Sequence, residues 1–330
     1  MNILVTGAGG FLGLYIVEQL IARGDNVRTF CRGNYPALER LGVGQVRGDV
    51  RDRDAVIDAC RGIDVVFHTA AVAGIWGPWS HYYGINTQGT FHVVDGCRKH
   101  GVSRLVFTSS PSVTFDGNDQ CGIDESARYP EKWMCHYSHT KALAEQHVLQ
   151  SNDNDQLLTC SLRPHLIWGP RDNHLIPRLI ERAKSGRLRR VGDGTNLIDT
   201  VYVDNAATAH LQAADELRPN SPVAGSAYFI SQGEPVNCWD WIDDILALAG
   251  IGPVEKSVSL AAATRAGSLC EAVFGLLRIK SEPPMTRFLA RQLGTSHYFD
   301  IGRAESDFNY RPDVSTTEGM RRLSAELKYA

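Results

Sequence analysis

The most constraining feature of this sequence is a glycine-rich segment near its start, Thr6 to Gly13, which reads TGAGGFLG. It lies between a short apolar run and a segment whose apolar residues recur at helical spacing. Gly7 permits a tight turn, Gly10 lets the backbone approach a diphosphate, and Gly13 permits close packing of helix on sheet. Phe11 and Leu12 begin the helix, whose free N–H groups can bind phosphates. The segment therefore predicts a dinucleotide-binding turn between a buried strand and a helix.

Strand and helix patterns alternate through the first half of the chain. Short apolar runs, typical of buried parallel strands, occur at 2–6, 27–31, 45–47, 65–67, 105–107 and 157–162. Segments with apolar residues at helical spacing lie between them, at 11–23, 52–60, 83–100 and 135–150. This alternation predicts an α/β fold with a doubly wound parallel sheet of the Rossmann type.

The second half is less regular, and its helical patterns lie at 174–184, 205–217, 239–249 and 316–327. We expect residues 1–164 to form the dinucleotide-binding domain, with 192–231 returning to it. Residues 165–191 and 232–330 are then a smaller, mostly helical C-terminal substrate-binding region. Open α/β sheets bind ligands at the carboxyl ends of their strands, where this region is expected to pack.

Composition excludes several classes of protein. Lys and Arg number 34 and Asp and Glu 37, so no basic excess suggests a nucleic-acid partner. The eight cysteines form no CxxC pair and lie beside no histidine cluster, so we expect reduced thiols and no metal site. No apolar stretch is long enough to span a bilayer, and no charged segment with a long apolar core stands at the start. We therefore expect a cytoplasmic protein.

The end of the second predicted strand indicates which nicotinamide dinucleotide is preferred. An acidic residue there would bind the ribose 2′-hydroxyl of NAD, but the sequence reads Phe30-Cys31-Arg32-Gly33. Arg32 can pair with a 2′-phosphate, and Arg28 is a second candidate. The alternative is that Arg32 is only a solvated loop residue. The pattern favours NADP(H) over NAD(H).

Tyr137 and Lys141 are four residues apart and share one face of a predicted helix. A phenol is a poor acid–base catalyst at neutral pH, and a nearby ammonium group lowers its pKa. Ser110 and Ser112 follow the fifth predicted strand, where a hydroxyl could hold a substrate carbonyl opposite the tyrosine. These hydroxyls could instead satisfy backbone groups at the strand end. We interpret Ser110, Tyr137 and Lys141 as a catalytic set.

Together these residues resemble the extended short-chain dehydrogenase/reductase family over the whole chain. The resemblance implies that Asp49 and Val50 bind the adenine and that the backbone around Ala70 lines the cofactor. It also implies further cofactor contacts from Thr69 and Ala71, from the nicotinamide-side residues Pro164, His165 and Ile167, and from Lys141 toward the ribose.

A finer resemblance is to the 3β-hydroxysteroid dehydrogenase branch, carried by TSSPSVTFDG (108–117), LRPHLIWGPRD (162–172) and GDGTNLIDTVYVDN (192–205). Within it, AVAGIWGPWSHYYGIN (71–86) and SEPPMTRFLARQL (281–293) are similar to bacterial 2-alkyl-3-oxoalkanoate reductases of olefin biosynthesis. Sugar-nucleotide epimerases usually place an Arg where this chain has Ile198, and an apolar side chain cannot hold a diphosphate. The substitution favours an apolar substrate.

Candidate substrate contacts are Trp76, Tyr82, Ser112, His165 and Ile198. Core packing is an equal alternative for the aromatic residues. The largely apolar segment 257–280 is either a pocket lid, a helix packed on the core, or a membrane-surface helix, and we favour the first two.

The predicted activity is reversible hydride transfer between NADP(H) and a ketone or secondary alcohol on a hydrophobic substrate, best matched by a 2-alkyl-3-oxoalkanoate. Alternatives are a 3β-hydroxysteroid or sterol-4-carboxylate dehydrogenase, a nucleotide-sugar epimerase or dehydratase, and a non-catalytic NADP-binding regulator. Helices 83–100 and 135–150 could pair two copies of the chain, and partners could include enzymes of the same pathway.

Overall fold

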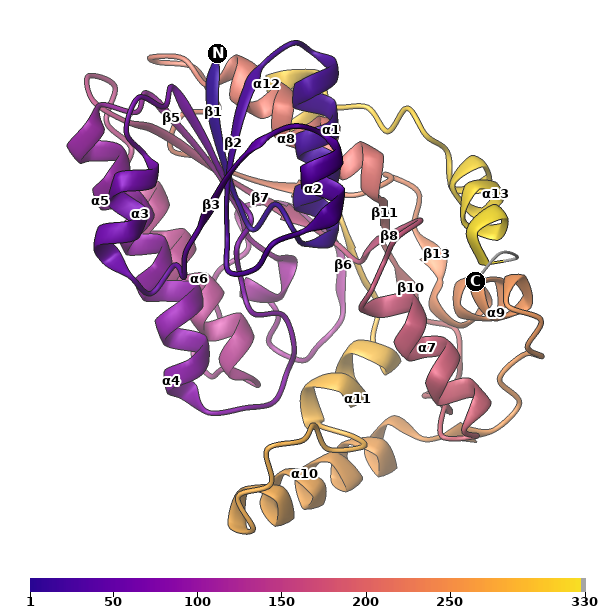
Figure 1. The fold of residues 1–330 in the computed structure, drawn as a ribbon. Helices are drawn as coiled ribbons and strands as arrows, with labels where there is room; N and C mark the ends of the chain where they lie inside the picture. The colour runs from indigo at the N-terminus through magenta and orange to yellow at the C-terminus, as the bar shows by residue number, and fades with distance from the viewer. Residues whose placement is uncertain (328–330) are drawn as a thin grey trace.

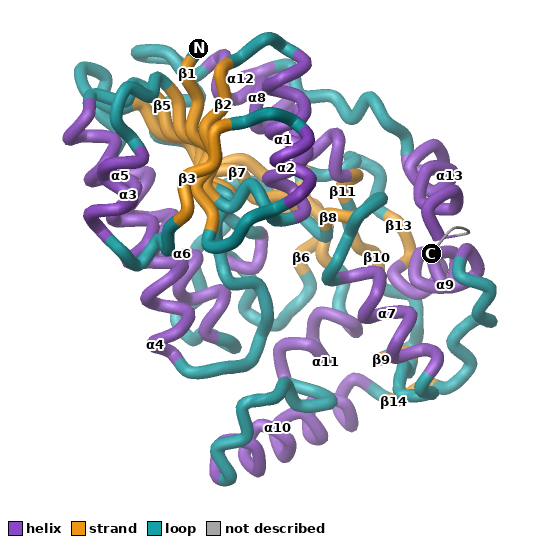
Figure 2. Tube along the Cα trace, in the orientation of Figure 1, coloured by secondary structure: helices purple, strands orange, loops and turns teal. Residues whose placement is uncertain are grey.

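A computed structural model describes residues 1–327, and its centre is a seven-stranded parallel sheet (Figures 1 and 2). The strand order is β12-β7-β5-β4-β1-β2-β3, with every neighbouring pair parallel. The strands are β1 (Asn2–Thr6), β2 (Asn26–Cys31), β3 (Gly44–Arg47), β4 (Val65–His68), β5 (Arg104–Thr108), β7 (Leu158–Pro164) and β12 (Ala227–Ile230). The chain runs outward from β1 in both directions, so a crevice forms between the ends of β1 and β4.

Helices cover both faces of the sheet (Figure 1). One face carries α1 (Phe11–Ala22), α2 (Pro36–Arg40), α8 (Val203–Glu216) and α12 (Gly302–Phe308). The other carries α3 (Arg53–Ala59), α5 (Gly89–His100) and α6 (His136–Gln150), with α4 (Trp79–Tyr82) below them. A sheet buried on both faces needs strands that are apolar throughout, and Ile3, Leu4 and Val5 on β1 are all fully buried. The Rossmann prediction is confirmed.

A π-helical segment, Tyr83–Gln88, takes the place of the first turns of the α-helix that the sequence predicts over 83–100. It buries Asn86, whose side chain accepts from Val72 N–H at 2.8 Å and donates to Thr140 Oγ1 at 3.2 Å. The extra residue per turn re-aims Asn86 toward the loop after β4 and the helix α6. Wide turns of this kind occur often at functional sites.

The remaining elements form a smaller region beside the carboxyl ends of the strands. Its four-stranded sheet has the order β13 (Val236–Asn237), β10 (Leu197–Ile198), β15 (His297–Phe299) and β6 (Gln120–Ile123). Two short pairs are β8 (Ile167–Trp168) with β11 (Val201–Tyr202), and β9 (Arg190–Val191) with β14 (Ser257–Val258). Its helices are α7 (Leu175–Lys184), α9 (Cys238–Leu248), α10 (Leu260–Leu276), α11 (Arg287–Gly294) and α13 (Thr316–Leu327).

The chain crosses between the two regions more often than the sequence indicates. Within 192–231, α8 and β12 join the main sheet while β10 joins the second sheet. Strand β6 comes from the first 164 residues but pairs with β15, whereas α12, from the last 100, packs on the main core through Ala304 and Phe308. Residues 328–330 of the predicted substrate-binding region lie outside the described residues.

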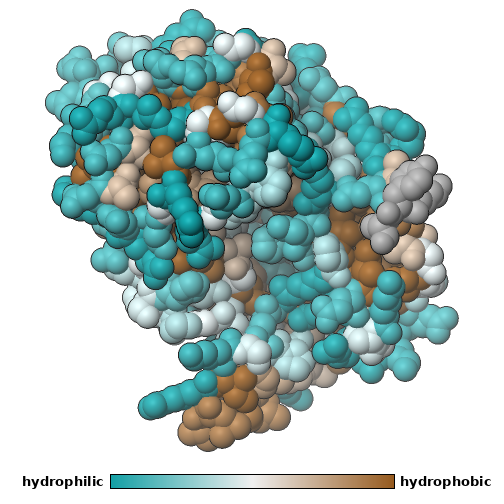
Figure 3. Space-filling model, in the orientation of Figure 1, coloured by the Kyte–Doolittle hydropathy of each residue, from teal (hydrophilic) through white to brown (hydrophobic). Residues whose placement is uncertain are grey.

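Helix α10 projects from the lower end of the molecule (Figure 1). One side packs on α11, and a Cβ added to Gly267 would lie 2.5 Å from the Thr286 carbonyl carbon. The other side exposes Leu269, Val273, Leu276 and Leu277, which Figure 3 shows as an apolar area at that end. Within residues 1–327, no helix combines the length and apolar character needed to cross a bilayer.

Candidate active site

The glycine-rich turn packs tightly against the loop that follows β4. Gly7 has a φ of +74°, and a Cβ there would lie 2.6 Å from the Ala70 nitrogen. A Cβ on Gly13 would lie 2.5 Å from the Gly7 carbonyl oxygen, and Gly10 N–H donates to that same oxygen at 2.8 Å. A side chain at Gly7 would therefore push the turn away from the loop after β4, and one at Gly13 would push α1 away from the turn, because backbone atoms face both positions.

A cavity of about 460 Å³ opens above this turn. Most of the predicted cofactor residues line it: Gly7, Gly10, Arg32, Asp49, Val50, Thr69, Ala70 and Ala71. Gly13, Phe11 and Leu12 do not, because Gly13 and Leu12 are buried under the turn and the Phe11 ring packs edge-on against Tyr15. Sequence reasoning missed Tyr35, His81, Asn173 and His174, which reach this cavity from three different segments.

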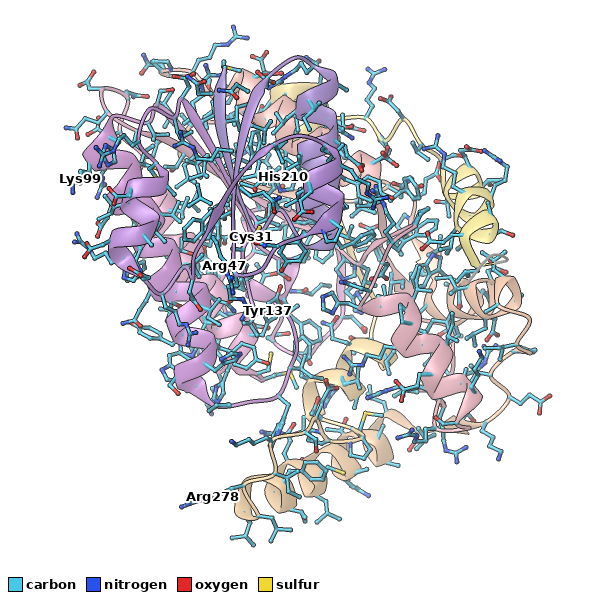
Figure 4. The ribbon with its side chains drawn as sticks, in the orientation of Figure 1. Cys31, Arg47, Lys99, Tyr137, His210 and Arg278 are labelled. Carbon is cyan, nitrogen blue, oxygen red and sulfur yellow. The ribbon has the colours of Figure 1, made fainter. Side chains whose placement is uncertain are left out.

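The cationic groups at the ends of β2 and β3 differ from those expected. Arg32 is exposed and lines the cavity, and Arg47, which pairs with Cys31 across the sheet, donates to the Arg32 carbonyl at 3.0 Å. Figure 4 shows Arg47 and Cys31 near each other at these strand ends. Arg28 is directed elsewhere, because it donates to the Ala59 and Arg61 carbonyls at the end of α3. The suggested assistance from Arg28 is therefore wrong, and Arg47 is the second cation at these strand ends.

Asp49 is held beside these cations by Arg51. Their ion pair measures 2.7 Å, and hydrogen bonds from Arg51 lower the pKa of Asp49 to about 2 despite partial burial. The positive charge of Arg32 acts in the same direction. Asp49 is therefore ionised at neutral pH, with its charge offset locally by Arg51.

A second, largely apolar cavity of about 190 Å³ adjoins the first, and Ala73 lines both. It contains Ser110, Ser112 and Tyr137 of the sequence-predicted set. Pro111 begins a short 3₁₀ turn after β5, and this turn places the Ser110 and Ser112 hydroxyls 2.9 Å apart. The rest of the lining is mainly apolar or aromatic: Ile75, Phe115, Pro164, Leu166, Phe288 and Phe299.

Tyr137 stands at the first turn of α6, with its phenol in this pocket (Figure 4). Burial raises the pKa of Tyr137, and a hydrogen bond from Ser110 opposes that shift. Lys141, one turn further along, donates to the Thr108 carbonyl and lies 4.1 Å above the Phe107 ring. Burial lowers the pKa of Lys141 to about 7, against the charge of Glu145. The lowered phenol pKa expected from this pair is not seen in this arrangement.

The three residues predicted to contact the nicotinamide side of the cofactor do not all line the same cavity. Pro164 and His165 line the smaller, apolar cavity, and Leu166 lines it in place of Ile167. Ile167 pairs with Val201 in β8 and packs on the main core. Leu166 has a φ of 42°, which is outside the extended region. The side chains after β7 therefore do not point to alternate sides as they would along a strand.

Three predicted substrate residues line neither cavity. Ile198 is fully buried in the core of the smaller region. Tyr82 is also buried, and its hydroxyl donates to the Trp76 carbonyl at 3.1 Å. The Trp76 indole donates to the Ile279 carbonyl at 3.1 Å, so it joins the segment after α10 to the loop whose Ile75 lines the pocket. These aromatic side chains shape the loop and do not form the pocket wall.

A glycine turn against a parallel sheet, opening beside a serine, a tyrosine and a lysine, defines the NAD(P)-dependent dehydrogenases and reductases of the Rossmann class. Residues 4–261 match the 3-beta hydroxysteroid dehydrogenase/isomerase family, and the chain belongs to that family. It is therefore an NAD(P)-dependent dehydrogenase or reductase.

Two relatives carry the likeness over nearly the whole chain. A 2-alkyl-3-oxoalkanoate reductase of Stenotrophomonas maltophilia is 50% identical over 98% of this chain and 99% of that protein. A 2-alkyl-3-oxoalkanoate reductase of Shewanella oneidensis is 46% identical over 98% of this chain and 85% of that protein. Among solved structures, the Thermus thermophilus UDP-glucose 4-epimerase complex with NAD superposes with a TM-score of 0.72 at 25% identity, covering 100% of both chains. We take only the shared fold from this last likeness.

Proposed function

We propose that this chain interconverts 2-alkyl-3-oxoalkanoates and 2-alkyl-3-hydroxyalkanoates, with NADP(H) as its cofactor. The observation that carries the proposal is the placement of Ser110 and Tyr137 in an apolar pocket that adjoins the dinucleotide cavity. The two reductases described above support the choice of substrate. An apolar lining suits the alkyl chains, and the two hydroxyls suit the oxygen at C3.

The residues present fit the cofactor. Gly7, Gly9 and Gly10 line the larger cavity without side chains, and the N-terminus of α1 stands behind them. Backbone N–H groups and the helix dipole at such a turn bind a diphosphate, and Asp49 and Val50 would hold the adenine. When bound, the nicotinamide supplies the hydride for reduction or accepts it during oxidation.

The chain's own residues orient the substrate and move the proton. The Ser110 hydroxyl would donate to the substrate carbonyl oxygen and fix its position beside Tyr137. Tyr137 gives a proton to that oxygen in reduction and takes it back in oxidation. Lys141, within one turn of Tyr137, would stabilise the phenolate and hold the ribose once released from the Thr108 carbonyl.

The preference for NADP(H) is supported by Arg32, which lines the cavity, and by Arg47, which donates to the Arg32 carbonyl. Two guanidinium groups can bind a 2′-phosphate, and no acidic residue stands at the end of β2 to favour an unmodified ribose. Arg32→Ala and Arg47→Ala should each raise KM for NADP⁺ at least about tenfold while leaving KM for NAD⁺ nearly unchanged. Arg61→Ala, which removes an exposed guanidinium outside the cavity, is the control. Equal effects on both cofactors would contradict the proposed preference.

The activity is tested by following NADP⁺ reduction with a 2-alkyl-3-hydroxyalkanoic acid and, in parallel, with a 3β-hydroxysteroid. The hydroxy acid is the practical probe because 3-keto acids decarboxylate spontaneously. We expect turnover of the acid and its loss in Tyr137→Phe and Lys141→Ala. Tyr228→Phe removes a phenol outside both cavities and should keep the activity. Turnover of the steroid alone would replace the proposed substrate with the sterol alternative, and near-normal kcat in Tyr137→Phe would refute the mechanism.

We also infer a cytoplasmic location and a homodimer built from α5 and α6. All eight cysteines are free thiols and six are buried, which suits a reducing compartment. Light scattering on the purified chain tests the dimer. A mass of one chain at micromolar concentration would contradict it.

A further inference from the structure

The catalytic pocket has a polar end made of two buried histidines. His165 follows β7 and His297 begins β15, and their ring centroids are 4.8 Å apart. Both line the same cavity as Ser110 and Tyr137. They come from distant parts of the chain, so only the packing of the smaller region against the main sheet brings them together.

Each ring has one nitrogen committed to a backbone carbonyl. His165 Nδ1 lies 2.6 Å from the Asp199 carbonyl oxygen, and His297 Nε2 lies 2.7 Å from the Gln292 carbonyl oxygen. A carbonyl oxygen can only accept, so both of these nitrogens carry hydrogen. The other nitrogen of a neutral ring is then an unprotonated acceptor. His297 Nδ1 is fully buried and has no hydrogen-bond partner anywhere in residues 1–327.

The pocket contains no other side chain that could hold an anion by charge. Among its described lining residues there is no lysine, arginine, aspartate or glutamate, and the polar ones besides the histidines are Ser110, Ser112, Gln120, Tyr137 and Gln292. A carboxylate on the carbon next to the reacting carbonyl must lie close to Ser110 and Tyr137. Buried charges in proteins are paired, so the substrate's carboxylate needs a cation in this small space.

We propose that His165 and His297 form the subsite that recognises the substrate carboxylate, and that one of the two rings takes up a proton when the acid binds. The inference rests on the proposed function and names the group that makes the site selective for an acid. A neutral sterol alcohol would gain nothing from this subsite. The pair is therefore a specificity determinant within the pocket.

The surrounding charges are compatible with proton uptake. Burial lowers the pKa of both histidines, so the rings are neutral before the acid arrives. The facing carboxylates are Asp199, which accepts from Phe299 N–H at 2.8 Å, and Asp119, which accepts from Ser296 N–H at 2.8 Å. The negative charge of Asp119 favours protonation of His297, and Tyr137 is the remaining titratable group of the pocket. A bound carboxylate adds a stronger pull in the same direction.

Binding that takes up a proton weakens as the pH rises. If one ring is protonated on binding, the KM of the acid should increase by up to about tenfold per pH unit between pH 6 and 8. The methyl ester of the same acid carries no charge and requires no proton. Its KM should stay nearly constant over this range, which separates the subsite from the titration of Tyr137 and Lys141.

The experiment compares kcat/KM for a 2-alkyl-3-hydroxyalkanoic acid and for its methyl ester, with NADP⁺, in the wild type and in His165→Gln and His297→Gln. We expect the wild type to prefer the acid and each variant to lose that preference by at least about tenfold. His147→Gln is the control, because this half-buried ring stacks on Phe91 outside both cavities. It should leave the acid-to-ester ratio unchanged.

Failure of the inference can be distinguished from failure of the proposed function. If the wild type oxidises neither acid nor ester, the proposed function is wrong. If it oxidises both equally well, or if KM of the acid does not change with pH, the function stands and the carboxylate subsite is refuted. These two measurements need only the wild-type protein, so they decide the question even if a variant fails to fold.

Discussion

The buried ion pair beneath the catalytic helix offers the sharpest test of how this fold is stabilised. Arg163 on β7 and Glu145 on α6 are 2.6 Å apart, with side chains only 4% and 0% exposed. Glu145 also accepts from Tyr129 at 2.7 Å and from Ser161 at 2.8 Å. Arg163→Met keeps a long side chain in place but leaves the carboxylate without its counter-ion.

The expected cost follows from that burial. Removing one partner of a buried pair leaves an uncompensated charge and destabilises a protein by about 3–5 kcal/mol. That is a large part of a total stability on the order of 5–15 kcal/mol. In the double variant with Glu145→Gln neither charge of this pair remains, so it should be more stable than Arg163→Met alone. In Glu145→Gln the amide oxygen can still accept from one of the two hydroxyls, and the amide NH2 can donate to the oxygen of the other.

The loss should also depend on pH. In the wild type burial raises the pKa of Glu145, but the charge and hydrogen bonds of Arg163 outweigh it and the net shift is downward. A lowered folded-state pKa gives stability that is present above the unfolded value of about 4.3 and is lost as the pH falls below it. In Arg163→Met the hydrogen bonds of Tyr129 and Ser109 still lower the pKa of Glu145, but without the arginine we expect burial to outweigh them and to raise the folded-state pKa. The stability difference between variant and wild type should therefore grow from pH 5 to pH 8.

Urea denaturation followed by fluorescence measures these free energies, and the exposed pair of Arg321 and Glu318 gives the control. Arg321→Met should leave the free energy of unfolding nearly unchanged, because exposed pairs contribute little. A loss of less than about 1 kcal/mol in Arg163→Met, equal at pH 5 and pH 8, would refute the assignment of Glu145 as a buried carboxylate that depends on Arg163.

Three further predictions follow from single contacts. Gly13→Ala should weaken NADPH binding, measured by fluorescence titration, at least about tenfold, because backbone atoms oppose its Cβ; unchanged affinity would contradict the tight packing. Asn86→Leu should lower kcat more than it changes NADPH affinity, because Asn86 ties the loop after β4 to α6; equal losses of kcat and of affinity would contradict this. Burial raises the pKa of Asp199 to about 6, so ionising it costs stability as the pH rises from about 4 to 6. Relative to wild type, Asp199→Asn should therefore gain about 1 kcal/mol between pH 5 and pH 8 in urea titrations, and a constant difference would argue against a raised pKa.

Much of the main domain could be predicted because its signals are local. The turn at Gly7 and the apolar runs of β1 and β4 each specify a short element, and parallel strands flanked by helices admit few arrangements. The π segment at Tyr83–Gln88 could not be predicted, since its residues continue a helical pattern and only the contacts of Asn86 show the wider turn. The placement of β6 beside β15 likewise depends on a pairing across more than 170 residues.

The same distinction between local and long-range signals separates the site residues that could be predicted from those that could not. Ser110 and Tyr137 were found from local motifs, whereas His297 was missed because it lies in a short strand without any chemical pattern around it.

Arg28 and Arg32 show the limit of such prediction for two residues that are close in the sequence. Arg28 lies within β2 and Arg32 directly after it, yet Arg28 turns back to the end of α3 and Arg32 lines the cavity. Spacing alone does not tell which end of the sheet a long side chain reaches.

The buried pair of Arg163 and Glu145 also bears on the chemistry of the site. One face of α6 carries Tyr137, Lys141 and Glu145, because these residues follow one another at intervals of four. The negative charge of Glu145 favours the ammonium form of Lys141, and burial opposes it, which leaves the pKa of that group at about 7. Arg163 neutralises Glu145 and thereby limits its influence on Lys141, while its chain neighbours Pro164 and His165 line the catalytic pocket. With Arg163 removed, Glu145 would either pull Lys141 toward its charged form or take a proton itself. The pH dependence of kcat in Arg163→Met should therefore shift, and an unchanged profile would separate the stabilising role of the pair from any role in catalysis.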